Sequence, residues 1–189
     1  MYGMVNKALQ DMVAGAYGDE VWERIKAVAK IDTDLFLSSE AYPDEVTYSL
    51  AGAASEVLGR PVPELLEAFG SYWVLRTAMD GYGDLMAAGG RTLREFLINL
   101  PSFHTRVGLI FPHLRPPHFR CSHVAETSLC LHYSSEREAL TPFVVGLIRG
   151  LAELFHTPVQ IEVLEHKDPG DREVFRISWS QTATQASTD

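Results

Sequence analysis

Leu100-Pro101-Ser102-Phe103-His104 is the stretch from which this 189-residue chain is best interpreted. A histidine among apolar residues suits a metal ligand, because a neutral imidazole can bind a metal where water is excluded. Pro101 would clash inside a continuous helix, whereas the first turn of a helix tolerates proline. We therefore predict a new helix that begins near Pro101, carries His104 one turn in and ends near Phe111. Within it, Val107 and Phe111 are spaced to share the face of His104.

Two further pieces of sequence follow, Leu-Arg-Pro-Pro-His-Phe-Arg-Cys at 114–121 and Leu-His-Tyr-Ser-Ser-Glu-Arg at 131–137. Tyr133, Ser135 and Arg137 stand two residues apart, so on a strand their side chains would project from one face. A guanidinium can grip a carboxylate with a pair of charge-assisted hydrogen bonds, and hydroxyls can donate to the remaining oxygens. This set of donors suits a doubly charged carboxylate or phosphate.

In this order and at these separations, the three pieces resemble the haem nitric oxide/oxygen-binding (H-NOX) family. That family includes stand-alone bacterial sensors and the haem domain of soluble guanylate cyclase. The resemblance covers roughly Met1 to Trp179 and implies a b-type haem, ferrous in its working state, with His104 as the axial ligand. It also implies that Pro117 presses on the macrocycle. The residues that would hold the haem propionates are Tyr133, Ser135 and Arg137.

The resemblance also indicates which gas is sensed. In oxygen-binding members, a tyrosine on the helix after Tyr-x-Ser-x-Arg donates a hydrogen bond to bound O₂; Phe143 stands at that place here, and phenylalanine cannot donate. NO and CO need much less help from a polar pocket, so they are the implied ligands. Trp73 carries an indole N–H, and an O₂ sensor that uses Trp73 as its donor stays open as an alternative. The other residues matched to the distal wall are Val5, Leu9 and Leu147.

The function that the resemblance implies is a switch rather than catalysis. NO weakens the iron bond trans to it, so release of His104 would free its helix and relax the haem against Pro117. The signal would pass to a separate protein, for which the family implies a histidine kinase or a cyclic-dinucleotide enzyme. The chain has no phosphate-binding glycine loop, no nucleophile elbow and no His-Glu-x-x-His motif. We therefore expect no enzymatic activity from it.

A second group of metal-binding side chains lies between the two motif pieces. His113, His118, Cys121 and His123 could bind zinc, but their spacing matches no strong zinc template. Strand alternation would place Cys121 and His123 on one face. A haem-free zinc protein or hydrolase that uses this region stays open as an alternative, as does the redox activity of Cys121 and Cys130.

Composition narrows the class of protein. The hydrophobic fraction is 46% and the charged fraction 22%, as in ordinary globular domains. The net charge of −9, without a basic cluster, argues against nucleic-acid binding. We find neither a signal peptide nor an apolar run of the roughly 20 residues that a membrane span needs. With only two cysteines, the chain suits a reducing compartment, so we expect a cytoplasmic protein.

Periodicity predicts an α+β fold, with an N-terminal helical subdomain packed on a mixed half that contains a four-stranded antiparallel sheet, and the haem between them. We expect one domain over 1–179, divided into a distal subdomain (1–60) and a haem-clamping subdomain (61–179), with a flexible tail at 180–189. The expected helices span about 4–16, 19–29 and 43–59, then one from 61 broken at 80–83, one opened by a Thr92–Glu95 capping box, and one capped by Thr141-Pro142. The expected strands are 119–125, 128–134, 159–163 and 175–179, with a turn at 167–171.

Overall fold

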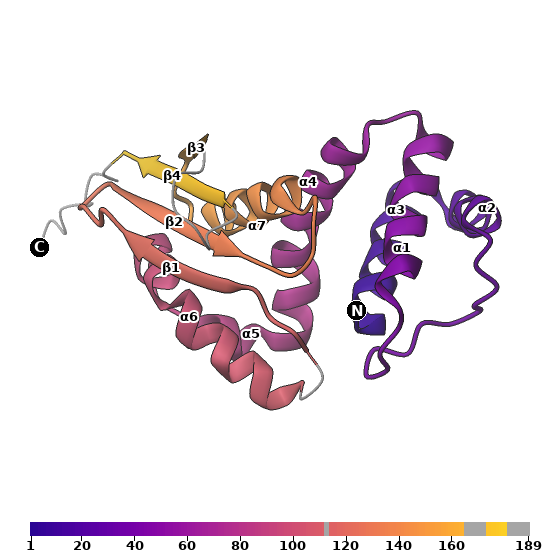
Figure 1. The fold of residues 1–189 in the computed structure, drawn as a ribbon, viewed down its shortest axis with the longest axis horizontal. Helices are drawn as coiled ribbons and strands as arrows, with labels where there is room; N and C mark the ends of the chain where they lie inside the picture. The colour runs from indigo at the N-terminus through magenta and orange to yellow at the C-terminus, as the bar shows by residue number, and fades with distance from the viewer. Residues whose placement is uncertain (112–113, 165–172, 181–189) are drawn as a thin grey trace, which may run out of the picture.

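The computed structural model describes residues 1–111, 114–164 and 173–180. Three helices form the N-terminal group at one end of the molecule (Figure 1). They are α1 (Gly3–Tyr17), α2 (Asp19–Ala29) and α3 (Asp44–Leu58). Gly18, at φ 89°, separates α1 from α2, and Gly59 ends α3 at φ 64°, the left-handed C-cap that a glycine favours.

The next helical segment is longer than the sequence suggested. α4 (Val62–Tyr72), a π-helical stretch η1 (Trp73–Ala78) and α5 (Met79–Ala87) follow without a loop. The predicted break at 80–83 is present as a kink inside α5, not as a loop. Only Tyr82 leaves helical geometry, at φ −143° and ψ 31°, and the helix resumes after this single kinked residue. Glycines on either side of Tyr82 have open space around them, so the chain bends there without a clash.

α6 (Leu93–Ile110) carries His104 and is one continuous helix. The predicted cap is confirmed at its start, where the Thr92 side chain accepts a hydrogen bond from the Glu95 N–H at 3.2 Å. The prediction that a new helix begins at Pro101 is wrong, because α6 runs through it. Four buried side chains hold the first half of α6 in the core, and their burial offsets the roughly 3 kcal/mol that an internal proline costs. They are Leu93, Phe96, Leu97 and Leu100.

The predicted four-stranded antiparallel sheet is confirmed, in the order β1-β2-β4-β3. Its strands are β1 (His118–Ser122), β2 (Ser128–Ser134), β3 (Val159–Leu164) and β4 (Glu173–Trp179). β1 ends three residues earlier than expected because His123 has φ 48°, which is incompatible with an extended strand. The predicted turn at 167–171 lies outside the described residues, as do residues 181–189 of the expected flexible tail.

α7 (Thr141–Leu154) packs along α4 at backbone contact. A Cβ at Gly146 would collide with the backbone oxygen of Glu67, and one at Gly70 with that of Phe143. The Thr141 cap is a wrong prediction: α7 has no side-chain cap, and the Thr141 hydroxyl instead donates to the Glu173 carboxylate of β4. Thr141 thus fastens the start of α7 to the sheet.

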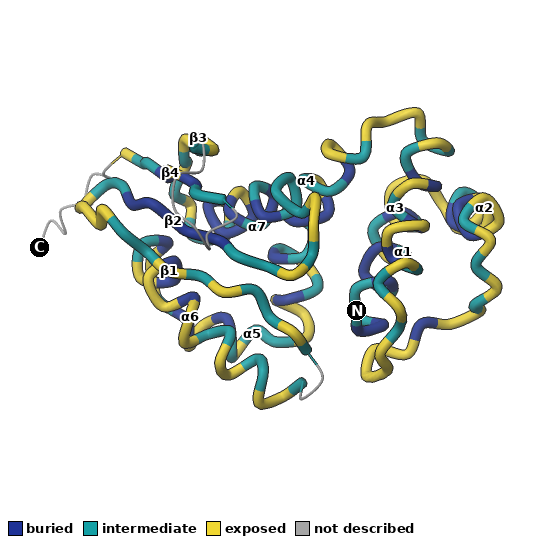
Figure 2. The backbone as a smooth tube through the Cα atoms, in the orientation of Figure 1, coloured by how far each residue is buried: buried dark blue, intermediate teal, exposed yellow. Residues whose placement is uncertain are grey.

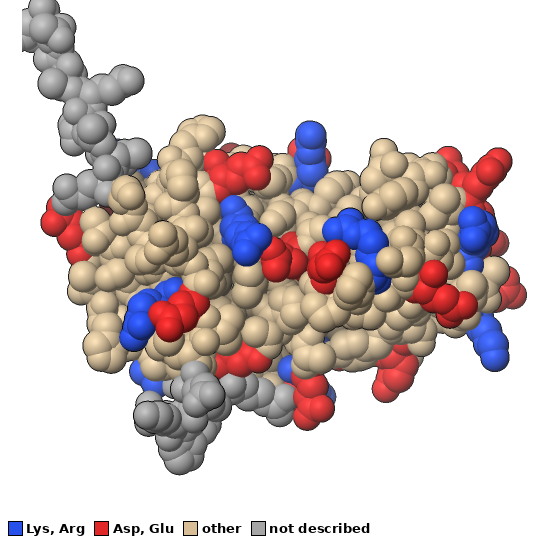
Figure 3. Space-filling view, turned by 90° about the horizontal axis from the view of Figure 1, so that it is seen from above, with Lys and Arg blue, Asp and Glu red and all other residues tan. Residues whose placement is uncertain are grey.

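Buried residues, dark blue on the backbone in Figure 2, form two clusters. One lies between the sheet, η1, α5, α6 and α7, and the other joins α1, α2 and α3 with α4. Trp73 packs against both clusters. Among the described residues, no helix combines the length and the apolar character that a bilayer span requires. Figure 3 shows basic side chains scattered among acidic ones, without a basic patch on the face it presents.

Candidate functional site

A cavity of about 290 Å³ lies between the N-terminal helices and the sheet half, and its walls are largely apolar. Every site residue predicted from the sequence lines it, although these residues come from α1, η1, α6, β2, α7 and two connecting segments. They are Val5, Leu9, Trp73, His104, Pro117, Tyr133, Ser135, Arg137, Phe143 and Leu147. The structure thus brings the whole set together, while the role of each residue stays a prediction.

His104 is held in one orientation by its own helix. Its Nδ1 lies 3.0 Å from the carbonyl oxygen of Leu100. A carbonyl can only accept, so Nδ1 carries the proton and Nε2 keeps its lone pair. Burial lowers the pKa of His104, and the bond to the Leu100 carbonyl only partly opposes that shift. The imidazole is therefore neutral, the form that binds a metal.

Phe119 links the histidine to the polar end of the cavity. Its ring centroid lies 5.0 Å from that of His104 and 5.4 Å from that of Tyr133. The sequence analysis did not single out Phe119, although its β1 position directly opposite Tyr133 could have indicated the contact. These ring contacts fix the distance between the candidate metal ligand and the candidate carboxylate-binding cluster.

The strand argument for Tyr133, Ser135 and Arg137 is wrong, because β2 ends at Ser134. Ser135 and Arg137 lie in the segment after the strand, where the Arg137 N–H donates to the Ser135 hydroxyl at 3.1 Å. This local bond, not strand alternation, keeps Arg137 near Ser135. Burial raises the pKa of Tyr133 more than its hydrogen bond with Ser135 lowers it, so the phenol stays a donor.

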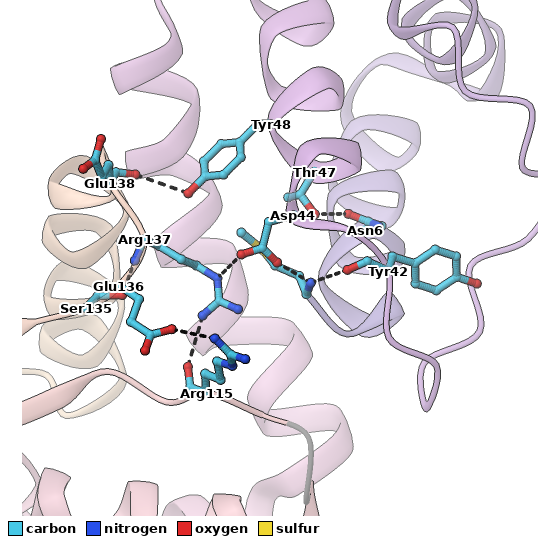
Figure 4. A network of polar contacts seen from close by, with 11 residues as sticks. Asn6, Tyr42, Asp44, Thr47, Tyr48, Arg115, Ser135, Glu136, Arg137 and Glu138 are labelled. Carbon is cyan, nitrogen blue, oxygen red and sulfur yellow. Dashed lines mark hydrogen bonds and ion pairs between the residues drawn. The ribbon is translucent and has the colours of Figure 1, made fainter.

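Arg137 is positioned by two acceptors (Figure 4). Its Nε donates to Oδ2 of Asp44 at 2.7 Å, and its Nη1 donates to the Arg115 carbonyl at 3.1 Å. A guanidinium has further N–H donors, so Arg137 can still bind another carboxylate. Asp44 is not among the site residues predicted from the sequence. Its partner is 93 residues away, and no local signal marks such a pair.

Asp44 also accepts a hydrogen bond from the terminal ammonium of Met1 at 2.5 Å. Burial by itself would raise the pKa of Asp44, but the bonds from the ammonium and Arg137 and the attraction of their charges outweigh it. The pKa of Asp44 therefore lies below its usual value. Tyr48, one turn along α3, donates its hydroxyl to the Glu138 carbonyl at 3.3 Å. Two polar contacts thus join α3 to the segment that follows β2.

The predicted distal residues form an apolar wall. Val5 and Leu9 come from α1, and Phe143 and Leu147 from α7. The Phe69 ring lies 5.5 Å from the Phe143 ring and 6.1 Å from the Trp73 ring. Within the described part of the chain, the Trp73 indole N–H makes no hydrogen bond, and Trp73 lines the cavity.

The histidine-rich region does not assemble a metal site in the part of the chain that the structure describes, where no three His, Cys, Asp or Glu side chains cluster suitably. His113 lies outside that part. The prediction that Cys121 and His123 share a strand face is wrong, since β1 ends at Ser122. The Ser122 hydroxyl instead lies 2.7 Å from Nε2 of His132 and 3.0 Å from Nδ1 of His123.

These observations fit a haem. An apolar cavity with a neutral imidazole on its wall, and with phenol, hydroxyl and guanidinium donors at one end, is the donor set of a haem-binding protein. The family model described as Haem-NO-binding matches residues 2–163, and this chain belongs to that family, the H-NOX proteins. The family is one of haem-binding gas sensors that signal to partner domains, and the H-NOX domain itself is the sensor part, without catalytic activity.

Relatives include two soluble guanylate cyclases of Caenorhabditis elegans. Gcy-31 is 33% identical over 167 residues, which cover 87% of this chain and 24% of that protein. Gcy-35 is 33% identical over 173 residues, which cover 88% and 25%. The chain therefore spans about a quarter of the length of these relatives.

Solved structures share the predicted α+β fold. The Fe(II)NO form of an H-NOX protein from S. oneidensis superposes with a TM-score of 0.84 at 21% identity, covering 96% of this chain and 100% of that one. The unliganded Fe(II) H-NOX protein from K. algicida gives a TM-score of 0.85 at 22% identity, covering 97% and 99%. At these identities the likeness concerns the fold.

Proposed function

We propose that this chain senses NO, and also CO, at a ferrous b-type haem with His104 as the axial ligand. The observation that carries the proposal is that Phe143 lines the cavity. The family resemblance aligns Phe143 with the tyrosine that donates to O₂ in oxygen-binding members. The neighbouring side chains Val5, Leu9 and Leu147 have no donor either. NO and CO bind ferrous haem without such help, whereas bound O₂ carries negative charge and benefits from it.

The chain's own residues would hold the haem at two places. His104 would bind the iron through Nε2, the nitrogen that its bond to the Leu100 carbonyl leaves free. Tyr133, Ser135 and Arg137 would donate to the propionates. Pro117 lines the same cavity and would contact the macrocycle. The bound haem would supply the iron that binds the gas, and His104 would be the protein's ligand to that iron.

Release of His104 would free the second half of α6. The half before Pro101 carries the fully buried residues of this helix, whereas the residues from Pro101 to Ile110 are exposed or half-buried. The part that could move is therefore the less buried half of a continuous helix, not a separate short helix. We further propose that the subdomains divided near residue 60 shift relative to each other as the haem relaxes, with the signal read by another protein.

The absorption spectrum of the purified ferrous protein tests the proposal. We expect a Soret band, a five-coordinate ferrous spectrum, spectral changes with NO and CO, and no stable O₂ complex in air. His104→Gly should abolish the five-coordinate ferrous spectrum, and added imidazole should restore it. A colourless protein after haem reconstitution, or a His104→Gly protein with the spectrum of the original, would overturn it.

An O₂ sensor is the second candidate, and a specific observation favours it. Trp73 lines the cavity, and its indole N–H makes no hydrogen bond within the described residues. This N–H could donate to bound O₂. A ferrous protein that forms a stable O₂ complex in air, and loses it in Trp73→Phe, would establish this function. An original protein without such a complex would exclude it.

The partner belongs to the proposal as well. We propose a separate histidine kinase or cyclic-dinucleotide enzyme as the receiver of the signal. The test adds the unliganded and the NO-bound protein to such an enzyme from the same genome and measures autophosphorylation or cyclic-dinucleotide turnover. We expect the two forms to act differently, and the difference to vanish with His104→Gly. Equal effects of both forms would refute the enzyme chosen as the partner.

A further inference from the structure

Pro101 leaves one carbonyl of α6 without its usual partner. A helical carbonyl accepts from the N–H four residues later, and proline has none, so the carbonyl of Leu97 lacks this bond. Leu97 is fully buried, at 0% exposure, so water cannot supply a donor readily. A buried carbonyl without a partner destabilises the fold.

A thiol from the sheet supplies the missing donor. Sγ of Cys121, on β1, lies 3.4 Å from the carbonyl oxygen of Leu97. Since a carbonyl only accepts, the S–H must donate. Burial raises the pKa of the Cys121 thiol to about 11, with a smaller contribution from Cys130, so the proton stays on the sulfur at neutral pH.

This bond lies where the burial of α6 changes. The residues before Pro101 hold the helix in the core, the residues after it are exposed or half-buried, and His104 follows Pro101 by less than one turn. A helix bends most easily at an internal proline, because a ladder hydrogen bond is absent there. The direction of the imidazole therefore depends on how firmly this joint is held.

We propose that Cys121 is a positioning residue for His104: its thiol donates to the Leu97 carbonyl that Pro101 leaves free, and so fixes the joint of α6 from which the iron ligand projects. The hydrogen bond between Cys121 and Leu97 does not depend on bound haem. Its consequence for iron rests on the proposed function of His104.

A double-mutant cycle tests the contact without haem, with amide hydrogen exchange from Ser102 to Thr105 as the readout. Cys121→Val removes the donor and keeps the size, and should speed exchange roughly threefold to tenfold, the effect of one hydrogen bond. Pro101→Ala gives the helix its own donor for Leu97, so in that background Cys121→Val should change exchange less than about twofold. Equal effects in both backgrounds would overturn the proposal.

Two controls sharpen this cycle. Cys121→Ser keeps a donor and should stay closer to the original protein than Cys121→Val. Cys130→Val alters the neighbouring buried thiol, which makes no hydrogen bond among the described residues, and should leave the exchange of Ser102 to Thr105 unchanged. If the Val variant fails to fold, infrared spectroscopy of the original protein decides. The Cys121 S–H stretch must lie at lower frequency than that of Cys130, and equal frequencies would overturn the contact.

The iron–histidine stretch in the resonance Raman spectrum of the ferrous protein tests the consequence. We expect Cys121→Val to shift or broaden this band and Cys121→Ser to leave it near the original. An unchanged band in Cys121→Val would overturn the positioning role. Failure of the proposed function looks different: the band would be absent from the original protein, while the hydrogen-exchange cycle would still report the thiol contact.

Discussion

Nε of Arg137 donates to Oδ2 of Asp44 at 2.7 Å, and this pair joins the segment after β2 to the first turn of α3. The side chain of Arg137 is 20% exposed and that of Asp44 is 33% exposed, so solvent screens the pair only in part. Arg137 also lines the cavity, whereas Asp44 does not. One guanidinium therefore lies between a partner in the N-terminal helices and the cavity proposed to hold haem.

Asp44→Asn should lower the stability of the protein at neutral pH by about 1 kcal/mol or less, because the pair is partly exposed. The pKa of Asp44 lies below its usual value in the folded state. The stabilisation is therefore present above the unfolded pKa of about 3.9 and is lost as pH falls through the lower folded value. Urea unfolding should show a difference between variant and original that is larger at pH 7 than near pH 3.

Asp11→Asn is the matched control for this prediction. Asp11 pairs with Lys7 at 2.7 Å, but both side chains are nearly half exposed. Removal of such a helical surface pair should change stability by less than about 0.5 kcal/mol. An Asp44→Asn protein that is no less stable than Asp11→Asn at pH 7 would show that the joint contributes nothing to folding.

Gly146→Ala should destabilise the protein by about 2–4 kcal/mol and lower its haem content. The added methyl group would collide with the backbone of Glu67, so α7 would have to move away from α4. Gly52→Ala is the control, since nothing lies within 4 Å of its added Cβ and alanine favours a helix. It should stabilise by about 0.5–1 kcal/mol. Thermal unfolding and the Soret absorbance per chain measure both effects.

Much of the fold could be predicted because its signals are local. Gly18 and Gly59 mark helix ends through their left-handed geometry, and apolar alternation predicts β3 and β4. The predicted start of a helix at Pro101 was wrong, because two effects outweigh the local cost of the proline. They are the burial of the first half of α6 and the hydrogen bond that Cys121 of β1 donates to it. Burial and long-range partners are not visible in a local pattern.

The site residues likewise include some that the sequence could predict and some contacts that it could not. Tyr133 could be predicted from its motif. Arg137, however, is oriented by its bond to Asp44, which is far away in the sequence. Phe119 and Leu100 contact His104, but neither has a functional group that a sequence motif would identify as part of the site. Motifs thus predicted which side chains meet at the cavity, whereas the contacts that orient them required the tertiary structure.

Phe143→Tyr should give the proposed distal wall a hydroxyl donor and so favour O₂ binding. A hydrogen bond to a ligand that carries charge contributes about 1.5–3 kcal/mol, so O₂ should dissociate roughly tenfold more slowly or more. Stopped-flow measurement of the ferrous protein in aerated buffer checks this. Phe143→Leu, which adds no donor, should behave as the original does. Equal O₂ dissociation from the Tyr and Leu variants would show that residue 143 does not face the gas.

Arg137→Gln should release haem faster, because the amide cannot grip a propionate with paired, charge-assisted hydrogen bonds. We expect the rate of haem transfer to excess apomyoglobin to rise roughly tenfold. The variant also breaks the pair with Asp44, and Asp44→Asn separates the two effects, since it loosens the joint but leaves the guanidinium available. Arg176→Gln, which alters an exposed pair with Glu162, controls for the loss of surface charge. Haem loss from Asp44→Asn as fast as from Arg137→Gln would mean that Arg137 retains haem only by holding the N-terminal helices in place, without gripping the propionate itself.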